Sequence, residues 1–233
     1  MKYEAKIALP LYKLIYSMLF MVIVILVRPI SSYSEIISVL ESGVALLAGV
    51  FAADNYYMEY RNDRISTYYL FPFRKKCASL LKRTFISQVY FIALIAVFYW
   101  GFVLMYRPTN YSGVPIAALY LQCVGACAAS MFFMGILCFT ATNLLRNIGM
   151  GIGFFFLVWL FLTSSVTRIL PRLLQLFKLS GEVVQDGFLT PYWPSRILYA
   201  AVAVGLLFLN LYPVNKQPDH NKKGRCKHGN KGM

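Results

Sequence analysis

The stretch PLYKLIYSMLFMVIVILVR, residues 10–28, has a single charged residue, Lys13, between its first residue and its closing arginine. A membrane-spanning helix needs roughly 20 mostly apolar residues, and this stretch has that length and composition. No small-residue cleavage site of the kind that ends a signal peptide follows it. The stretch therefore predicts a retained membrane span near the start of the chain.

The composition of the whole chain agrees with this prediction. Hydrophobic residues make up 59% of the 233 residues and charged residues only 14%, whereas soluble domains are nearer 45–50% apolar and about 25% charged. We expect an all-α integral membrane protein with one six-span domain, residues 1–213, and a disordered basic tail, residues 214–233. The other five spans are expected at about 36–54, 86–106, 114–143, 147–167 and 196–213.

The distribution of Lys and Arg predicts the orientation of these spans. If the spans alternate in direction, seventeen of the 23 basic residues fall on one side and six on the other. Cytoplasmic loops carry the excess of Lys and Arg, so we expect a multi-pass protein of the cell membrane with both termini in the cytoplasm. The same clustering between apolar runs argues against nucleic acid as the partner of this chain, despite its net charge of +14. The tail holds six basic residues and is expected to attract anionic lipid, at about 1 kcal/mol per charge near the surface.

The first expected cytoplasmic loop is EYRNDRISTYYLFPFRKKCASLLKR, residues 59–83, which contains seven basic residues. Pro72 cannot sit inside a regular helix, so we expect one short helix at about 57–70 and another from Phe73 onward. In the second helix, apolar and small residues recur at the spacing of one helical face, which predicts an interfacial helix before span three. The members of that face are Phe73, Cys77, Leu80, Leu81 and Thr84.

The first short helix mixes charge with aromatic and aliphatic side chains, which suits a contact with another protein. A solvated basic loop that only sets the topology is the alternative interpretation. The order of residues in this loop resembles the cytoplasmic loop of type-2 ABC exporter permeases. The matching elements are Glu59, the stretch from Arg61 to Arg64, TYYLFP ending at Pro72, Arg74, and LLKR at 80–83. Ser66 and Thr67 stand where that family usually has a glycine, so the exact turn that makes the contact stays open.

The resemblance implies a six-span fold with cytoplasmic termini, a cytoplasmic coupling helix between spans two and three, and a hairpin of short re-entrant helices between spans five and six. Residues 168–195 would form that hairpin, because four apolar residues there are spaced for one helical face and Ser180-Gly181 indicates a turn. Those four are Leu170, Leu173, Leu174 and Phe177. An ordinary outer loop with an interfacial helix is the alternative for this segment.

The resemblance also implies partners. A separate nucleotide-binding ATPase subunit would dock on the coupling helix, and a second permease chain, identical or paralogous, would complete the transporter. The residues that would bind the ATPase are Glu59, Arg61, Asp63, Arg64, Tyr68, Leu70, Pro72 and Arg74. ATP and Mg²⁺ would belong to that partner, because the nearest approach to a P-loop here, GRCKHGNK at 224–231, has Asn230 where the motif needs lysine. We expect a non-catalytic membrane subunit that binds no cofactor of its own.

Three polar residues within the expected spans are candidates for a substrate pathway: Glu41, Gln122 and Ser130. An ionisable group at membrane depth is a functional candidate by default, although Glu41 also suits an interfacial or helix-packing role. Gln122 and Ser130 lie among small residues, which equally favour close helix packing. Cys123 and Cys127 are one turn apart, but the spans contain no histidine, and we predict no metal site.

The favoured function is export of an amphipathic substrate, such as a peptide, an antibiotic or a lipid-like molecule, by alternating access powered by the ATPase. Two alternatives stay open. The first is an accessory or regulatory membrane protein without transport of its own. The second, which has less support, is an intramembrane enzyme. An enzyme needs gathered catalytic groups at membrane depth, whereas both histidines lie in the tail and the sequence suggests no partner for Glu41.

Overall fold

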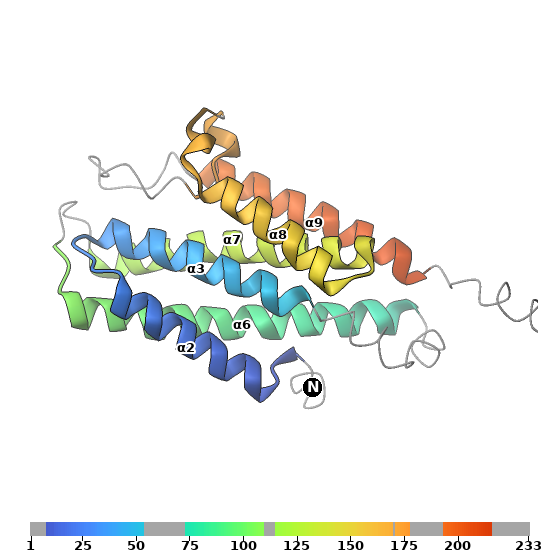
Figure 1. Ribbon diagram of the computed structural model, residues 1–233, viewed down its shortest axis with the longest axis horizontal. Helices are drawn as coiled ribbons and strands as arrows, with labels where there is room; N and C mark the ends of the chain where they lie inside the picture. Colours follow the sequence, from blue (N-terminus) through green and yellow to red (C-terminus); the bar gives the residue numbers. More distant parts are fainter. Residues whose placement is uncertain (1–7, 54–72, 110–114, 170, 178–192, 216–233) are drawn as a thin grey trace, which may run out of the picture.

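The computed structural model describes residues 8–53, 73–109, 115–169, 171–177 and 193–215. These residues form helices and connecting turns, with no β-strand in the ranges described, so the predicted all-α class is confirmed. The α-helices, shown in Figure 1, are α2 (Leu11–Val27), α3 (Tyr33–Ala53), α6 (Phe73–Tyr106), α7 (Ile116–Leu145), α8 (Ile148–Thr163) and α9 (Trp193–Asn215).

Each expected span coincides with one of these helices, but the helices differ in length. Four of them, α3, α6, α7 and α9, are long and apolar enough to cross a membrane. The other two, α2 and α8, have 17 and 16 residues, which corresponds to about 24–26 Å at 1.5 Å per residue. Several long apolar helices indicate a membrane-embedded protein, and the count of six spans stays a prediction.

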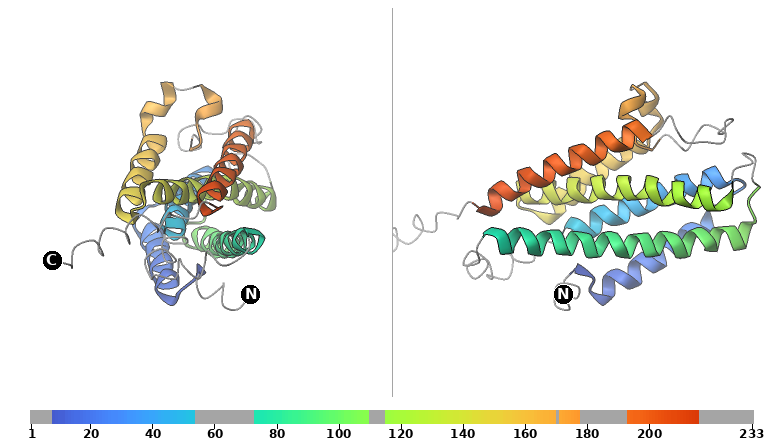
Figure 2. Two further views of the ribbon diagram at one scale, coloured as in Figure 1. Left: turned by 90° about the vertical axis from the view of Figure 1, so that its right-hand side faces the viewer. Right: turned by 180° about the vertical axis from the view of Figure 1, so that it is seen from behind.

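The helices pack around a central pair. Helices α3 and α7 form the most extensive helix contact, and Figures 1 and 2 show α2 and α6 on one side of this pair and α8 and α9 on the other. Of the four long helices, α3 has the most buried apolar window. Small residues allow this close packing, since Gly135 of α7 lies against the backbone of α3 at Ala48.

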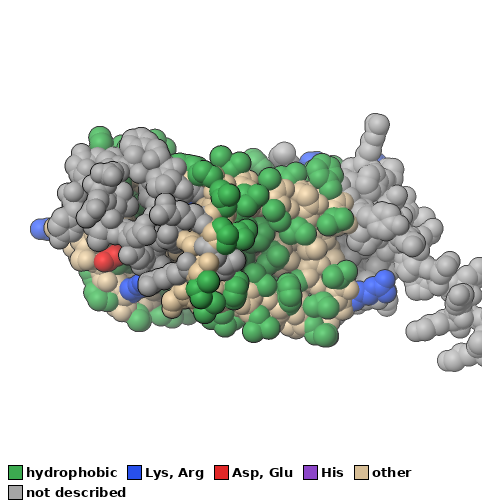
Figure 3. All heavy atoms as spheres, turned by 90° about the horizontal axis from the view of Figure 1, so that it is seen from above, with side chains coloured by type: hydrophobic (Ala, Val, Ile, Leu, Met, Phe, Trp, Pro, Cys, Tyr) green, Lys and Arg blue, Asp and Glu red, His purple; other side chains and the backbone are tan. Residues whose placement is uncertain are grey.

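Successive helices run in alternating directions along the long axis of the bundle (Figures 1 and 2). We call the end at which α3 and α7 end and α6 and α8 begin the basic end. Exposed Lys75, Lys82 and Arg146 lie there. Apolar side chains cover the middle of the face in Figure 3, whereas Lys and Arg gather towards its two ends. This arrangement suits an apolar layer between two polar boundaries.

Helix α6 starts at Phe73, directly after Pro72, as the sequence predicts, but its course differs from the expectation. We expected an interfacial helix that turns into span three, whereas α6 continues without a break from Phe73 to Tyr106, over 34 residues. The sequence supplies no reason for a bend, because residues 73–100 contain neither proline nor glycine. The cationic first turns are therefore a direct extension of the apolar helix.

The segment after α8 also differs from the expectation. Helix α8 ends at Thr163, and two 3₁₀ turns follow, Ser165–Ile169 and Arg172–Leu174. The predicted single helical face over 170–177 is wrong, because Phe177 is buried whereas Leu173 and Leu174 are exposed. Pro171 explains the interruption, since it lacks the backbone N–H and disfavours helical geometry at the preceding residue. The rest of the predicted hairpin, residues 178–192, lies outside the described ranges.

The packing of α3 against α8 depends on Gly49. A Cβ atom at this position would overlap the ring of the fully buried Phe155, and such overpacking typically costs about 1–3 kcal/mol. We expect Gly49→Ala to lower the midpoint of thermal unfolding of the purified chain in detergent, followed by circular dichroism.

Gly153→Ala is the matched control, because the same change on α8 meets no atom within 4 Å. Alanine is the better helix former by about 0.5–1 kcal/mol, so this control should keep or raise the midpoint. Equal midpoints for the two variants would contradict the close contact between α3 and α8.

Candidate functional site

Glu41 lies at the centre of a buried polar cluster that joins three helices. Its carboxylate accepts two hydrogen bonds from Arg196 Nη2 of α9, at 2.9 Å to Oε1 and 3.0 Å to Oε2. Ser130 of α7 donates a third, from Oγ to Oε1 at 2.6 Å. The exposed fractions of Glu41, Arg196 and Ser130 are 1%, 3% and 0%. We call these three residues the Glu41 cluster.

The Glu41 cluster resolves part of the question that the sequence left open. Glu41 does not reach the surface of the molecule and joins three helices, which agrees with the helix-packing role. Glu35 and Glu41 are the only acidic residues in the ranges that the structure describes, and Glu35 is exposed and accepts hydrogen bonds from Ser31. The carboxylate in the interior is therefore matched by one guanidinium, which leaves the cluster formally neutral.

Arg196 is the residue that reasoning from the sequence missed. Arg196 begins the last expected span, 196–213, and Glu41 lies five residues into the second, 36–54. Both spans begin on the side opposite the expected cytoplasmic termini, so the sequence places the two opposite charges near one side of the membrane. That coincidence is the available signal, because no local spacing relates residues 155 positions apart.

The start of α9 comes close enough to form this pair because α7 carries a glycine there. A Cβ at Gly125 would lie 2.7 Å from the Trp193 ring, so the ring packs directly on the α7 backbone. Trp193 and Arg196 lie three residues apart, on neighbouring positions of the helix surface. The aromatic ring and the guanidinium therefore attach the same turn of α9 to the centre of the bundle.

A second polar contact holds the other end of α9. Asn210 Nδ2 donates to Thr140 Oγ1 at 2.7 Å, and Asn143 Nδ2 donates to Asn210 Oδ1 at 3.0 Å. Both partners belong to α7. In apolar surroundings such side-chain hydrogen bonds between helices are worth about 0.6–2 kcal/mol each, so α9 is fixed to the core near both of its ends.

Helix α3 is held at its basic end by the buried side chain of Lys13. Lys13 of α2 is 2% exposed; its Nζ donates to the carbonyl oxygen of Phe51 at 3.0 Å and lies 5.2 Å from the centre of the Phe51 ring. Phe51 is in the last turn of α3, where carbonyls lack partners within the helix. A lysine is a suitable donor there because the end of a helix carries partial negative charge.

The third predicted pathway residue, Gln122, forms no hydrogen bond with the Glu41 cluster in the described part of the chain. Gln122 of α7 is buried, and its Oε1 has no hydrogen-bond partner among the residues described. Cys123 and Cys127 are buried, with their sulfur atoms 4.0 Å apart. Within the described ranges no three His, Cys, Asp or Glu side chains gather as a metal site would require.

The predicted ATPase-binding residues lie almost entirely outside the described part of the chain. Glu59, Arg61, Asp63, Arg64, Tyr68, Leu70 and Pro72 fall in the range 54–72. Arg74 is in the first turn of α6. The role of these residues stays a prediction.

No match was found for this chain among protein-family models, curated proteins or solved structures. The resemblance to type-2 ABC exporter permeases accordingly rests on the pattern of residues in the sequence.

The pairing of Glu41 with Arg196 predicts strong coupling between the two positions. We expect Glu41→Gln and Arg196→Gln each to destabilise the chain, because removing one partner of a buried ion pair costs about 3–5 kcal/mol. The double variant leaves two neutral amides and should be less destabilised than the sum of the single variants. Denaturant unfolding in detergent micelles measures all three.

Arg28→Gln is the control for loss of a positive charge, since Arg28 is exposed at the end of α2. It should leave stability within about 0.5 kcal/mol of the native chain. If the effects of Glu41→Gln and Arg196→Gln simply add, the two side chains do not interact and the cluster is not an ion pair.

Proposed function

We propose that the chain is the transmembrane permease subunit of an ATP-driven exporter, similar to type-2 ABC exporter permeases. In this proposal all six helices cross the membrane, and the basic end and both termini face the cytoplasm. The transported molecule is amphipathic, such as a peptide, an antibiotic or a lipid-like compound. Nucleotide-binding ATPase subunits carry ATP and Mg²⁺, and two permease chains together form the translocation path.

The observation that carries the proposal is the uninterrupted course of α6. Its 34 residues correspond to about 51 Å at 1.5 Å per residue, whereas the hydrocarbon core of a bilayer is about 30 Å thick. The helix therefore extends well beyond the hydrocarbon, and its cationic first turns follow the expected coupling helix directly. A force applied at that segment would be transmitted into the bundle by a single rigid element.

Three features support the crossing of all six helices. Their directions alternate along the bundle (Figure 1). The two shorter helices, at about 24–26 Å, approach the thickness of the hydrocarbon. Exposed large apolar side chains along α2 and α8 would face lipid; examples are Leu19, Val22, Phe154 and Leu157.

The proposal predicts a defined docking segment. We expect Leu70→Asp, and separately Glu59→Lys combined with Arg64→Glu, to abolish copurification of the ATPase subunit from mild detergent, while the chain stays in the membrane. The reason is that a mixed apolar and charged contact tolerates neither a buried carboxylate nor exchanged charges. Mass spectrometry of the purified complex measures the stoichiometry of the partner.

Arg146→Gln is the matched control, because Arg146 is exposed at the same end of the bundle, between α7 and α8. It should leave the ATPase bound in native amount. If the native chain purifies without a P-loop ATPase, under detergent conditions that keep known membrane complexes intact, the exporter proposal is wrong. If the ATPase stays bound to the docking variants, the assignment of residues 59–74 is wrong.

A further inference from the structure

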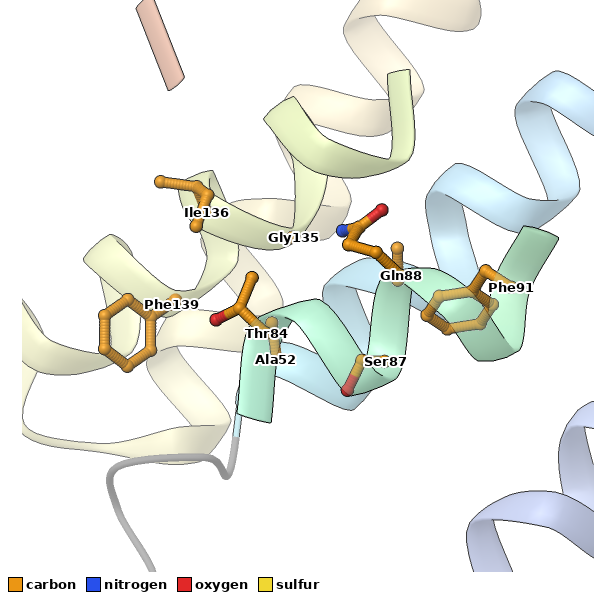
Figure 4. Close-up of a pocket in the computed structure, with 9 residues that line it drawn as sticks. Ala52, Thr84, Ser87, Gln88, Phe91, Gly135, Ile136 and Phe139 are labelled. Carbon is orange, nitrogen blue, oxygen red and sulfur yellow. The ribbon is translucent and has the colours of Figure 1, made fainter. Parts of the chain in front are cut away.

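A small cavity of about 20 Å³ lies between α3, α6 and α7, near the basic end of the bundle. Figure 4 shows its polar wall on α6, where Thr84 lies one turn before the adjacent Ser87 and Gln88, and its opposite wall on α3 and α7. A cavity needs at least about 10–15 Å³ of this kind of space to hold a water molecule. The cavity therefore admits one group of the size of water.

The polar wall offers hydrogen-bonding capacity without charge. The hydroxyls of Thr84 and Ser87 donate to the carbonyl oxygens of Leu80 and Arg83, at 3.1 Å each. A hydroxyl that donates one bond keeps its oxygen as an acceptor. The half-buried Gln88 amide extends from α6 towards α7 (Figure 4) and supplies both a donor and an acceptor.

Small residues make part of the opposite wall, and Ile136 and Phe139 of α7 complete it. Ala48 and Ala52 of α3 and Gly135 of α7 line it, and a Cβ at Gly135 would lie 3.5 Å from the Ala48 carbonyl oxygen, an ordinary contact distance. Larger side chains at these positions would fill the space between α3 and α6. The lining residues include no Lys, Arg, Asp or Glu, which favours an uncharged occupant.

We propose that this cavity is a binding site for a neutral hydrogen-bonding group, a hydroxyl or an amide. Water occupies it in the resting chain, and the polar group of an amphipathic molecule takes its place during export. This second part rests on the exporter function proposed above. The cavity lies on the same face of α3 as Glu41, since positions 41, 48 and 52 follow the helical repeat, so polar groups mark this face at two depths.

The first test measures access of water to the cavity. Gln88→Cys places a thiol on the polar wall, and Val89→Cys places one at nearly the same depth on the outer surface of α6, where Val89 is 49% exposed. A thiol reacts as its thiolate, which forms in water but not in hydrocarbon. Methyl methanethiosulfonate should therefore modify position 88 at least about tenfold faster than position 89 in reconstituted vesicles.

Mass spectrometry of the segment 84–106, which contains no native cysteine, quantifies the modification. Ala52→Leu, from the opposite wall, should reduce the rate at position 88 to that at position 89, because the added side chain fills the cavity. Equal rates at positions 88 and 89 without the filling substitution would overturn the site. A rate at position 88 that Ala52→Leu leaves unchanged would overturn it equally, since access would then come from elsewhere.

The second test separates water from an amphipathic ligand. 1-Octanol and 1-chlorooctane both partition into the bilayer, but only the alcohol has a hydroxyl to donate. We expect 1-octanol to slow modification of Gln88→Cys and 1-chlorooctane to leave it unchanged. If neither compound slows a fast reaction, the cavity holds water only and the ligand part of the proposal is wrong. The chain alone suffices for both tests, so their results stay readable even if no ATPase partner is found.

Discussion

An ionised side chain in an apolar interior must have a partner of opposite charge, and the position of α9 follows from that requirement. Leaving Glu41 unpaired in the centre of the bundle would cost several kcal/mol. Arg196 removes this cost with two hydrogen bonds, and Ser130 adds a third. Because the carboxylate belongs to α3, the hydroxyl to α7 and the guanidinium to α9, the three helices can satisfy the charge only in one mutual arrangement. In the same arrangement the Trp193 ring of α9 packs on the α7 backbone at Gly125.

Apolar runs were sufficient to locate the helices, because the length and composition needed to cross a bilayer are demanding and leave few alternatives. Proline marked one boundary correctly, at Pro72 before α6. The sequence failed where geometry depends on contacts between distant segments. It predicted a helical face over 170–177, although Pro171 separates two short 3₁₀ turns, Ser165–Ile169 and Arg172–Leu174. It left Glu41 without a partner, since a salt bridge across 155 positions has no local signature, even though the charge distribution had placed both residues on the same side.

Lys13 shows a related limit of reading charge along the chain. As one of seventeen basic residues on the expected cytoplasmic side, it appeared to serve only the topology. In the folded chain it is buried and donates to the last turn of α3. Helix α2 also makes polar contacts with α6, through Ser17 with Tyr90 and through the carbonyl of Ile25 with Tyr106. Where lipid is as apolar as the helix surface, contacts of this kind decide where a peripheral helix sits, so a charge expected to act in topology also determines packing.

Arg196 and Lys13 together restrict how the bundle can move. Helix α3 is held near its start by Arg196 of α9 and at its end by Lys13 of α2, from opposite sides of the bundle (Figure 2), and it packs extensively on α7. Displacing α3 relative to these neighbours would expose or unpair at least one charge. Helix α6 is less buried than α3, and part of its contact with α3 and α7 is a cavity with one polar wall. Within the exporter proposal, α6 can move without breaking the contacts of Glu41 with Arg196 or of Lys13 with Phe51, and because it begins directly after the expected docking segment, it is the element on which the ATPase would act first.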